Sequence, residues 1–175
     1  MIRSSYLFII LFGVLTLQAC KQSPTNDSVA ESQTPSNSDA SANAVWFYNF
    51  NNAQAHSIKE NKPIMVYFSD GDTCSLCKQL KTNVFSTPVF NEWAKKSVVL
   101  LELDLSTKNQ LPQNFNEQHQ AMARSLKVND FPTIWILKIT HEPENDRFKV
   151  KPLGKIGYQE TPEKFIGLLQ NLTRK

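Results

Sequence analysis

Residues 63–80 read PIMVYFSDGDTCSLCKQL, and this stretch decides the fold. The apolar run from Pro63 to Phe68 has the length and the β-rich composition of a buried strand, and an amphipathic run typical of a helix follows it. Cys74 and Cys77 lie one helical turn apart where the predicted strand leads into the predicted helix. The first sulfur is therefore expected to cap the positive end of the helix dipole, which stabilises its thiolate. Because the second thiol can close a disulfide with it, the leading hypothesis for the chain is a reactive dithiol.

Composition excludes several other classes of protein. The 175 residues suffice for one domain with a sizeable core, and 41% hydrophobic with 20% charged residues is an ordinary globular composition. A net charge of +3 is too small and too scattered to indicate nucleic-acid binding. Three cysteines are too few for a disulfide-stapled scaffold, so each of them needs a separate explanation.

The N-terminus carries the features of a targeting signal. Arg3 precedes an apolar run, Tyr6 to Leu17, which is too short to span a bilayer and is typical of a signal peptide. The next residues, Leu17-Gln18-Ala19-Cys20, resemble the bacterial lipobox, in which the cysteine is acylated and becomes the first mature residue. A plain secretory cleavage site is the alternative, but it favours a small residue where Leu17 stands. Lys21 after the cysteine favours the outer membrane over the inner one.

A polar segment separates this signal from the folded region. Residues 21–44 are rich in Ser, Asn, Thr, Gln, Ala and Pro, with too little apolar surface to offset the entropy of ordering them. We expect a flexible tether with a span of roughly 25–30 Å. The predicted organisation is a lipoprotein signal peptide at 1–19, a lipidated flexible linker at 20–44 and one domain at 45–175. This places the domain in the bacterial cell envelope, lipid-anchored and facing the periplasm.

The folded region alternates strand and helix patterns. Its predicted order is β-α-β-α-β-α-β-β-α, with parallel strands first and an antiparallel hairpin last. The expected elements are an edge strand or lid at 46–50, a helix capped by Asn51 or Asn52 and running to about 61, strands at 64–68 and 98–105, a helix at 88–96, a polar helix at 115–126, a hairpin of 133–141 with 147–153, a break at 154–158, and a final helix capped by Thr161.

The helix after the dithiol has a predicted inner face. Leu76, Leu80 and Val84 recur at helical spacing, with lysines on the other side. This pattern turns Cys77 inward and leaves Cys74 at the mouth of the helix.

This order of elements resembles the thioredoxin fold over roughly residues 45–175. The narrower match consists of residues 62–68, residues 74–80 and Phe131-Pro132-Thr133, and is similar to bacterial envelope thioredoxin-family proteins. These include the thioredoxin-like domain of the transmembrane thiol:disulfide interchange protein. The resemblance implies an α/β fold with a central mixed sheet flanked by helices.

The resemblance also implies residue roles. Cys74 would be the nucleophile and Cys77 the resolving thiol, while Pro132 would be a cis-proline next to a Phe131 backbone that pairs with an extended substrate. No cofactor is expected beyond the Cys74–Cys77 disulfide. The expected partners are disulfide-bearing envelope proteins and a separate electron donor. Reduction is the favoured direction, although Ser75-Leu76, which tunes the redox poise, departs from the family's common dipeptides.

Two further positions depart from the family pattern. Thr73 stands where the family usually has Trp before the first cysteine. Tyr67 falls where many thioredoxins have a buried Asp that accepts a proton, and a phenol cannot do so at neutral pH. Proton transfer at Cys77 would then need Asp70, Asp72 or Asp104, or water.

Three other interpretations of the cysteine pair remain open. The pair could be a structural disulfide that never turns over, or part of a non-catalytic binding or chaperone module. A zinc site is a third alternative, but it needs four ligands, and His56, His119 and His141 are dispersed and expected at the surface.

Overall fold

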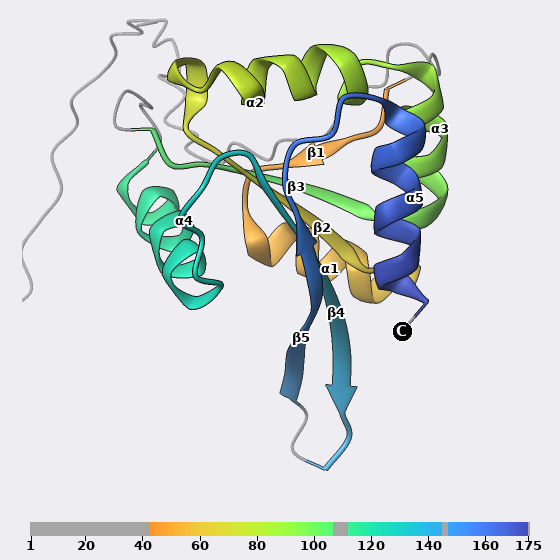
Figure 1. Ribbon diagram of the computed structural model, residues 1–175. Helices are drawn as coiled ribbons and strands as arrows, with labels where there is room; N and C mark the ends of the chain where they lie inside the picture. Colours follow the sequence, from red (N-terminus) through yellow and green to blue (C-terminus); the bar gives the residue numbers. More distant parts are fainter. Residues whose placement is uncertain (1–42, 107–111, 145–146, 175) are drawn as a thin grey trace, which may run out of the picture. The chain divides into compact units, whose positions relative to one another are not determined.

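The computed structural model describes residues 43–106, 112–144 and 147–174. The predicted signal peptide, Cys20 and the tether up to residue 42 lie outside the described residues. Figure 1 shows a sheet with helices packed on both of its faces. In chain order the elements are β1 (Trp46–Phe47), α1 (Phe50–Glu60), β2 (Ile64–Ser69), the 3-10 turn η1 (Gly71–Thr73), α2 (Ser75–Leu80), the π-helical turn η2 (Lys81–Phe85), α3 (Pro88–Ser97), β3 (Val99–Asp104), α4 (Gln113–Ser125), β4 (Thr133–Glu142), β5 (Arg147–Ile156) and α5 (Pro162–Thr173).

The sheet has the strand order β1-β3-β2-β4-β5. β1 and β2 both run parallel to β3, whereas β4 is antiparallel to β2 and forms a hairpin with β5. The predicted mixed sheet, with parallel strands first and a hairpin last, is confirmed. All six residues of β2 are buried, which explains why its sequence is continuously apolar instead of alternating.

Two hydrophobic clusters lie on opposite faces of the sheet. Met65 and Tyr67 of β2 pack with α2, η2, α3 and α5 on one face. Ile64, Val66 and Phe68 pack with α1 and α4 on the other. Because side chains alternate along a strand, one strand supplies both halves of the core, and full burial of each large side chain contributes about 1.5–3 kcal/mol.

The first helix begins two residues earlier than the sequence predicts. The N-cap is Asn49, and neither Asn51 nor Asn52 serves as the cap. The Asn49 side chain accepts hydrogen bonds from the backbone N–H groups of Asn51 and Asn52, at 2.8 and 3.3 Å. Asn49, Asn51 and Asn52 are all suitable cap residues, and the structure uses the first of them.

The inner face of the helix after the dithiol is also shifted. Leu76 is 41% exposed, so the prediction that it faces the core is wrong. Cys77, Leu80 and Val84 are buried. At about 100° per residue these three centre the inner face roughly 70° away from Leu76, which leaves it at the margin.

The last strand extends into the predicted break at 154–158 and ends within it. β5 runs to Ile156, with a register irregularity opposite Ile136 and Leu137. Gly154 has φ +155°, and a Cβ atom there would lie 2.6 Å from Cδ2 of Leu172 in α5. The glycine therefore permits close packing of α5 on the strand and does not end it.

Candidate active site

Cys74 and Cys77 form a disulfide at the junction of β2 and α2, with Cα atoms 5.2 Å apart. Cys74 is the N-cap of α2, and the backbone N–H of Cys77 donates a hydrogen bond to the Cys74 sulfur at 3.1 Å. The predicted capping by the first sulfur is confirmed. Cys74 is half-buried while Cys77 is 2% exposed, so the first sulfur is the more accessible one.

The loop before Cys74 is held by short polar contacts. Gly71 has φ +56°, and a Cβ atom there would meet the Ser106 side chain at 2.8 Å and Oδ1 of Asp104 at 3.3 Å. The Thr73 hydroxyl donates to the Asp70 carbonyl and carboxylate oxygens at 2.8 and 3.0 Å. Thr73, which replaces the tryptophan usual in related proteins, therefore closes the turn that leads into Cys74.

Phe131 and Pro132 lie at the same end of the sheet as the dithiol. Thr133, the first residue of β4, pairs with Phe68 near the end of β2. The peptide bond between Phe131 and Pro132 is cis, as the resemblance implied. Pro132 is buried, and Phe131 contacts both hydrophobic clusters. Their role in binding a substrate stays a prediction.

Tyr67 occupies the position where the resemblance to the thioredoxin fold implies a buried proton-accepting Asp. Burial raises the pKa of the Tyr67 phenol far above its ordinary value of 10.0, and the nearby Glu102 carboxylate raises this pKa further. The Ser69 hydroxyl acts in the opposite direction without reversing the shift. The phenol therefore stays protonated and takes no proton from Cys77.

Two of the three aspartates suggested as alternative bases accept hydrogen bonds within the domain. Asp70 accepts the Thr73 hydroxyl, and Oδ1 of Asp104 accepts the backbone N–H of Ser106 at 2.8 Å. Asp72 is exposed in η1. Their role in proton transfer stays a prediction.

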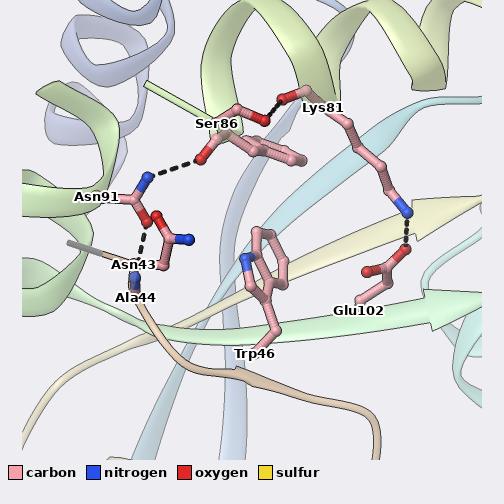
Figure 2. Close-up of a pocket in the computed structure, with 8 residues that line it drawn as sticks. Asn43, Ala44, Trp46, Lys81, Ser86, Asn91 and Glu102 are labelled. Atoms are coloured by element: carbon pink, nitrogen blue, oxygen red, sulfur yellow. Dashed lines mark hydrogen bonds and ion pairs between the residues drawn. The ribbon is translucent and has the colours of Figure 1, made fainter. Parts of the chain in front are cut away.

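An ion pair beside Tyr67 was not foreseen from the sequence. Nζ of Lys81 lies 2.6 Å from Oε1 of Glu102, whose side chain is only 13% exposed, and 5.8 Å from the centre of the Tyr67 ring. Figure 2 shows this pair at one side of a cavity of about 280 Å³ into which the Trp46 ring points. Two features of the sequence could have indicated this ion pair. Lys81 lies four residues after Cys77, and Glu102 stands between two leucines in β3.

Asn91 anchors the start of the domain on the opposite side of the same cavity (Figure 2). It is 3% exposed, its carbonyl oxygen accepts the backbone N–H of Ala44 at 2.7 Å, and its amide donates to the carbonyl oxygens of Phe85 and Thr87, each at 2.9 Å. One buried amide thus joins the first described residues to the end of η2.

His119 is fully buried, which contradicts its expected place at the surface. Its ring nitrogens lie 3.2 Å from the carbonyl oxygen of Asp104 and 2.9 Å from that of Tyr48. A polar helix pattern cannot reveal this, because the two partners come from distant parts of the chain. His56 and His141 are exposed, as expected.

Residues 43–106, 112–144 and 147–174 contain neither a metal-ligand cluster nor a membrane-spanning helix. None of their clusters of His, Cys, Asp and Glu has the three members that a metal site would need. Their helices are also too short or too polar to cross a membrane.

Comparison with known proteins identifies related sequences. The model of a family described as "Thioredoxin-like domain" matches residues 50–142. The disulfide bond reductase DsbH of Chlamydia pneumoniae is 27% identical over 95 residues, which are 54% of this chain and 57% of that protein. The thioredoxin-related protein DsbJ of the same organism is 24% identical over 110 residues, 63% of this chain and 31% of that protein. The aligned part thus spans about half or less of each relative.

Solved structures support the fold. A structure of DsbH oxidoreductase superposes with a TM-score of 0.66 at 21% identity, covering 77% of this chain and 88% of that one. The solution structure of a thioredoxin from Thermus thermophilus superposes with a TM-score of 0.54 at 21% identity, and the match covers 73% of this chain and 85% of that one. At these identities the likeness is one of fold.

Proposed function

We propose that this chain, which belongs to the thioredoxin-like domain family, is a thiol-disulfide oxidoreductase that acts through Cys74 and Cys77. The observation that carries the proposal is the hydrogen bond from the Cys77 N–H to the Cys74 sulfur at the start of α2. A donor at this position stabilises negative charge on sulfur, and the thiolate is the reactive form of cysteine. The half-buried Cys74 is therefore the attacking group and the buried Cys77 resolves the intermediate.

The proposed reaction has two exchange steps. The Cys74 thiolate attacks one sulfur of a substrate disulfide and forms a mixed disulfide, while the other substrate sulfur leaves as a thiolate and takes up a proton. Cys77 then loses its proton and attacks the Cys74 sulfur, the second substrate sulfur leaves as a thiolate and takes up a proton, and the Cys74–Cys77 bond forms. Two electrons and two protons pass to the substrate, and no cofactor besides the dithiol takes part.

We favour reduction of disulfides in envelope proteins as the working direction. Support comes from the relative named as a disulfide bond reductase, which aligns over about half of its length. A chain oxidised in each cycle needs a separate protein that returns two electrons to Cys74 and Cys77. The reverse direction would use the same two steps, so the redox potential of the pair decides between them.

We assign binding of the substrate backbone to Phe131 and Pro132. Phe131 lies two residues before Thr133, the first residue of β4, and an extended peptide that pairs with the Phe131 backbone would bind as in β-strand addition. Their position at the dithiol end of the sheet supports this assignment.

The lipid anchor is a separate part of the proposal. We propose that Cys20 is acylated, that the tether ends before Ala44, which is buried and hydrogen-bonded to Asn91 and so belongs to the domain and not to the predicted linker of 21–44, and that the anchor lies in the outer membrane with the domain facing the periplasm. Mass spectrometry of the mature N-terminus is expected to find an acylated Cys20, and Cys20→Ser should release the protein from membranes. An unmodified N-terminus at another residue would exclude the anchor.

Replacement of each cysteine tests the catalytic proposal. Wild type should catalyse reduction of a protein disulfide by dithiothreitol, and Cys74→Ser should abolish this catalysis. Cys77→Ser should accumulate mixed disulfides through Cys74, visible on non-reducing gels. Unchanged catalysis in Cys74→Ser would refute the proposal and favour a non-catalytic module whose disulfide is structural.

A further inference from the structure

A groove of about 620 Å³ opens beside the dithiol loop. Leu105, Val128 and Phe131 supply apolar side chains to its lining, and they come from the ends of β3, α4 and the segment before β4. Asp70 also lines the groove, immediately before η1 and four residues before Cys74. The groove therefore begins at the loop that presents the reactive sulfur, and its size is that of sites that hold a small ligand or a few side chains.

One wall of the groove is cationic. Arg124, in the last turn of α4, and Lys127, just beyond its end, both line the groove and are exposed. The backbone here is fixed, because the N–H of Lys127 donates to the carbonyl of Arg124 at 3.2 Å and the N–H of Val128 donates to the carbonyl of Ala123 at 3.0 Å. The backbone positions that carry the two cationic side chains are thus defined beside the groove.

The charges lining the groove are unevenly distributed. Asp70 is the one carboxylate among its described lining residues, and it accepts the Thr73 hydroxyl at the dithiol end. Arg124 lies in the last turn of α4 and Lys127 follows the end of this helix, so both cations come from a different element than Asp70. The part of the groove formed by α4 is therefore positive and complements an acidic group.

Phe131 joins this groove to the proposed substrate site. It lines the groove, and its backbone precedes Pro132, where the proposed function places the substrate chain. A polypeptide bound there by its backbone continues past the groove, and its neighbouring side chains can enter it.

We propose that the groove binds the segment beside the reactive disulfide of a protein substrate, and that Arg124 and Lys127 select segments with Asp or Glu in this position. The inference rests on the proposed function and names a substrate class for it. An apolar floor beside a cationic wall suits an acidic side chain carried on a polypeptide, because the chain's apolar atoms cover the floor while the carboxylate meets the cations.

Three matched disulfide peptides test the inference with the full-length chain. They differ only in having Glu, Ser or Lys at two positions beside one cysteine. Wild type is expected to reduce the Glu peptide with a kcat/KM roughly three- to tenfold above that of the Lys peptide, with Ser between them. Most of this preference should vanish at about 0.5 M salt, where exposed charges are screened.

Charge reversal on the groove wall provides the decisive comparison. Arg124→Glu with Lys127→Glu should invert the ratio of the Glu to the Lys peptide, and the milder Arg124→Gln with Lys127→Gln should bring it close to one. The matched control is Lys59→Glu with Lys164→Glu, which makes the same net charge change on exposed residues of α1 and α5 and should retain the wild-type ratio.

Two outcomes would overturn the inference, and they can be told apart. Turnover of all three peptides at equal kcat/KM, or an unchanged ratio in both Arg124/Lys127 variants, would exclude the groove as the selective element while the proposed function stands. Absence of turnover on every peptide would refute the proposed function and the groove with it. Because each readout is a ratio within one protein, partial loss of folded protein does not change it.

Discussion

Nε2 of His119 lies 2.9 Å from the carbonyl oxygen of Tyr48, a residue 71 positions earlier in the chain. Nδ1 of the same ring lies 3.2 Å from the carbonyl oxygen of Asp104 at the end of β3. The imidazole thus links the loop after β1 to the strand end that lies against Gly71, next to the dithiol turn. A neutral imidazole donates to one of these carbonyls and a protonated one to both.

Replacing His119 should destabilise the domain. His119→Leu removes the ring that contacts two part-buried carbonyl groups, which costs about 1–3 kcal/mol in the free energy of unfolding. Urea denaturation measures this cost. His56→Leu, at an exposed position, is the control and should change stability by about 0.5 kcal/mol or less. Equal effects of the two substitutions would show that the buried contacts of His119 contribute nothing.

Gly71→Ala should impair both stability and disulfide reduction. An L-residue in the left-handed region costs about 1–2 kcal/mol, and the added methyl would also meet the Ser106 side chain at 2.8 Å. Because this turn leads into Cys74, displacing it should also lower the rate of disulfide reduction. Thermal unfolding and turnover of a small disulfide measure the two effects.

Two companion variants make the Gly71 prediction specific. Ser106→Gly in the Gly71→Ala background should restore part of the lost stability, because it removes the clashing side chain. Gly167→Ala is the control, since a Cβ atom there meets nothing within 4 Å, and in α5 it should stabilise by about 0.5–1 kcal/mol. Absence of any rescue by Ser106→Gly would contradict the steric explanation.

Lys81 and Glu102 should be energetically coupled. A double-mutant cycle with Lys81→Met and Glu102→Gln is expected to give about 0.5–2 kcal/mol, because the Glu102 side chain is only 13% exposed. The exposed pair of Lys149 and Glu142, at 3.7 Å, is the comparison and should give less. Equal coupling in the two pairs would mean that burial beside Tyr67 adds nothing.

The raised pKa of Tyr67 predicts that the free energy of unfolding falls at alkaline pH. Its pKa is raised from 10.0 in the folded state, so above about pH 10 the unfolded chain loses a proton that the folded chain retains. This contribution to stability is complete below pH 10 and falls as pH rises above it. Tyr67→Phe should flatten the alkaline decline measured by urea denaturation at several pH values.

The same variant has a second expected effect at neutral pH. The Tyr67 hydroxyl is buried without a hydrogen-bond partner among the described residues, so Tyr67→Phe should leave stability there unchanged or slightly higher. Tyr48→Phe, at a residue that is 56% exposed, should flatten the alkaline decline less. An identical decline in wild type and Tyr67→Phe would refute the assignment to Tyr67.

Much of the fold follows from local sequence patterns. The strand at β2, the cap of α5 at Thr161 and the start of α3 at Pro88 each depend on a few adjacent residues, and all three predictions are confirmed. The errors occur where several local choices are nearly equal. Asn49, Asn51 and Asn52 offered three possible caps for α1, and Leu76 lay at the margin of a helical face.

In the candidate site, too, the features that depend on adjacent residues were predictable from sequence, and those that join distant residues were not. The dithiol and the capping of Cys74 by the Cys77 N–H depend on a spacing of three residues within one helical turn, so sequence alone predicts them. The pair of Lys81 with Glu102, the burial of His119 and the approach of Leu172 to Gly154 each join residues from different elements. Sequence determined the reactive group because its chemistry is local. Only the tertiary structure decided what surrounds that group, because such contacts depend on strand order and helix packing across long stretches of chain.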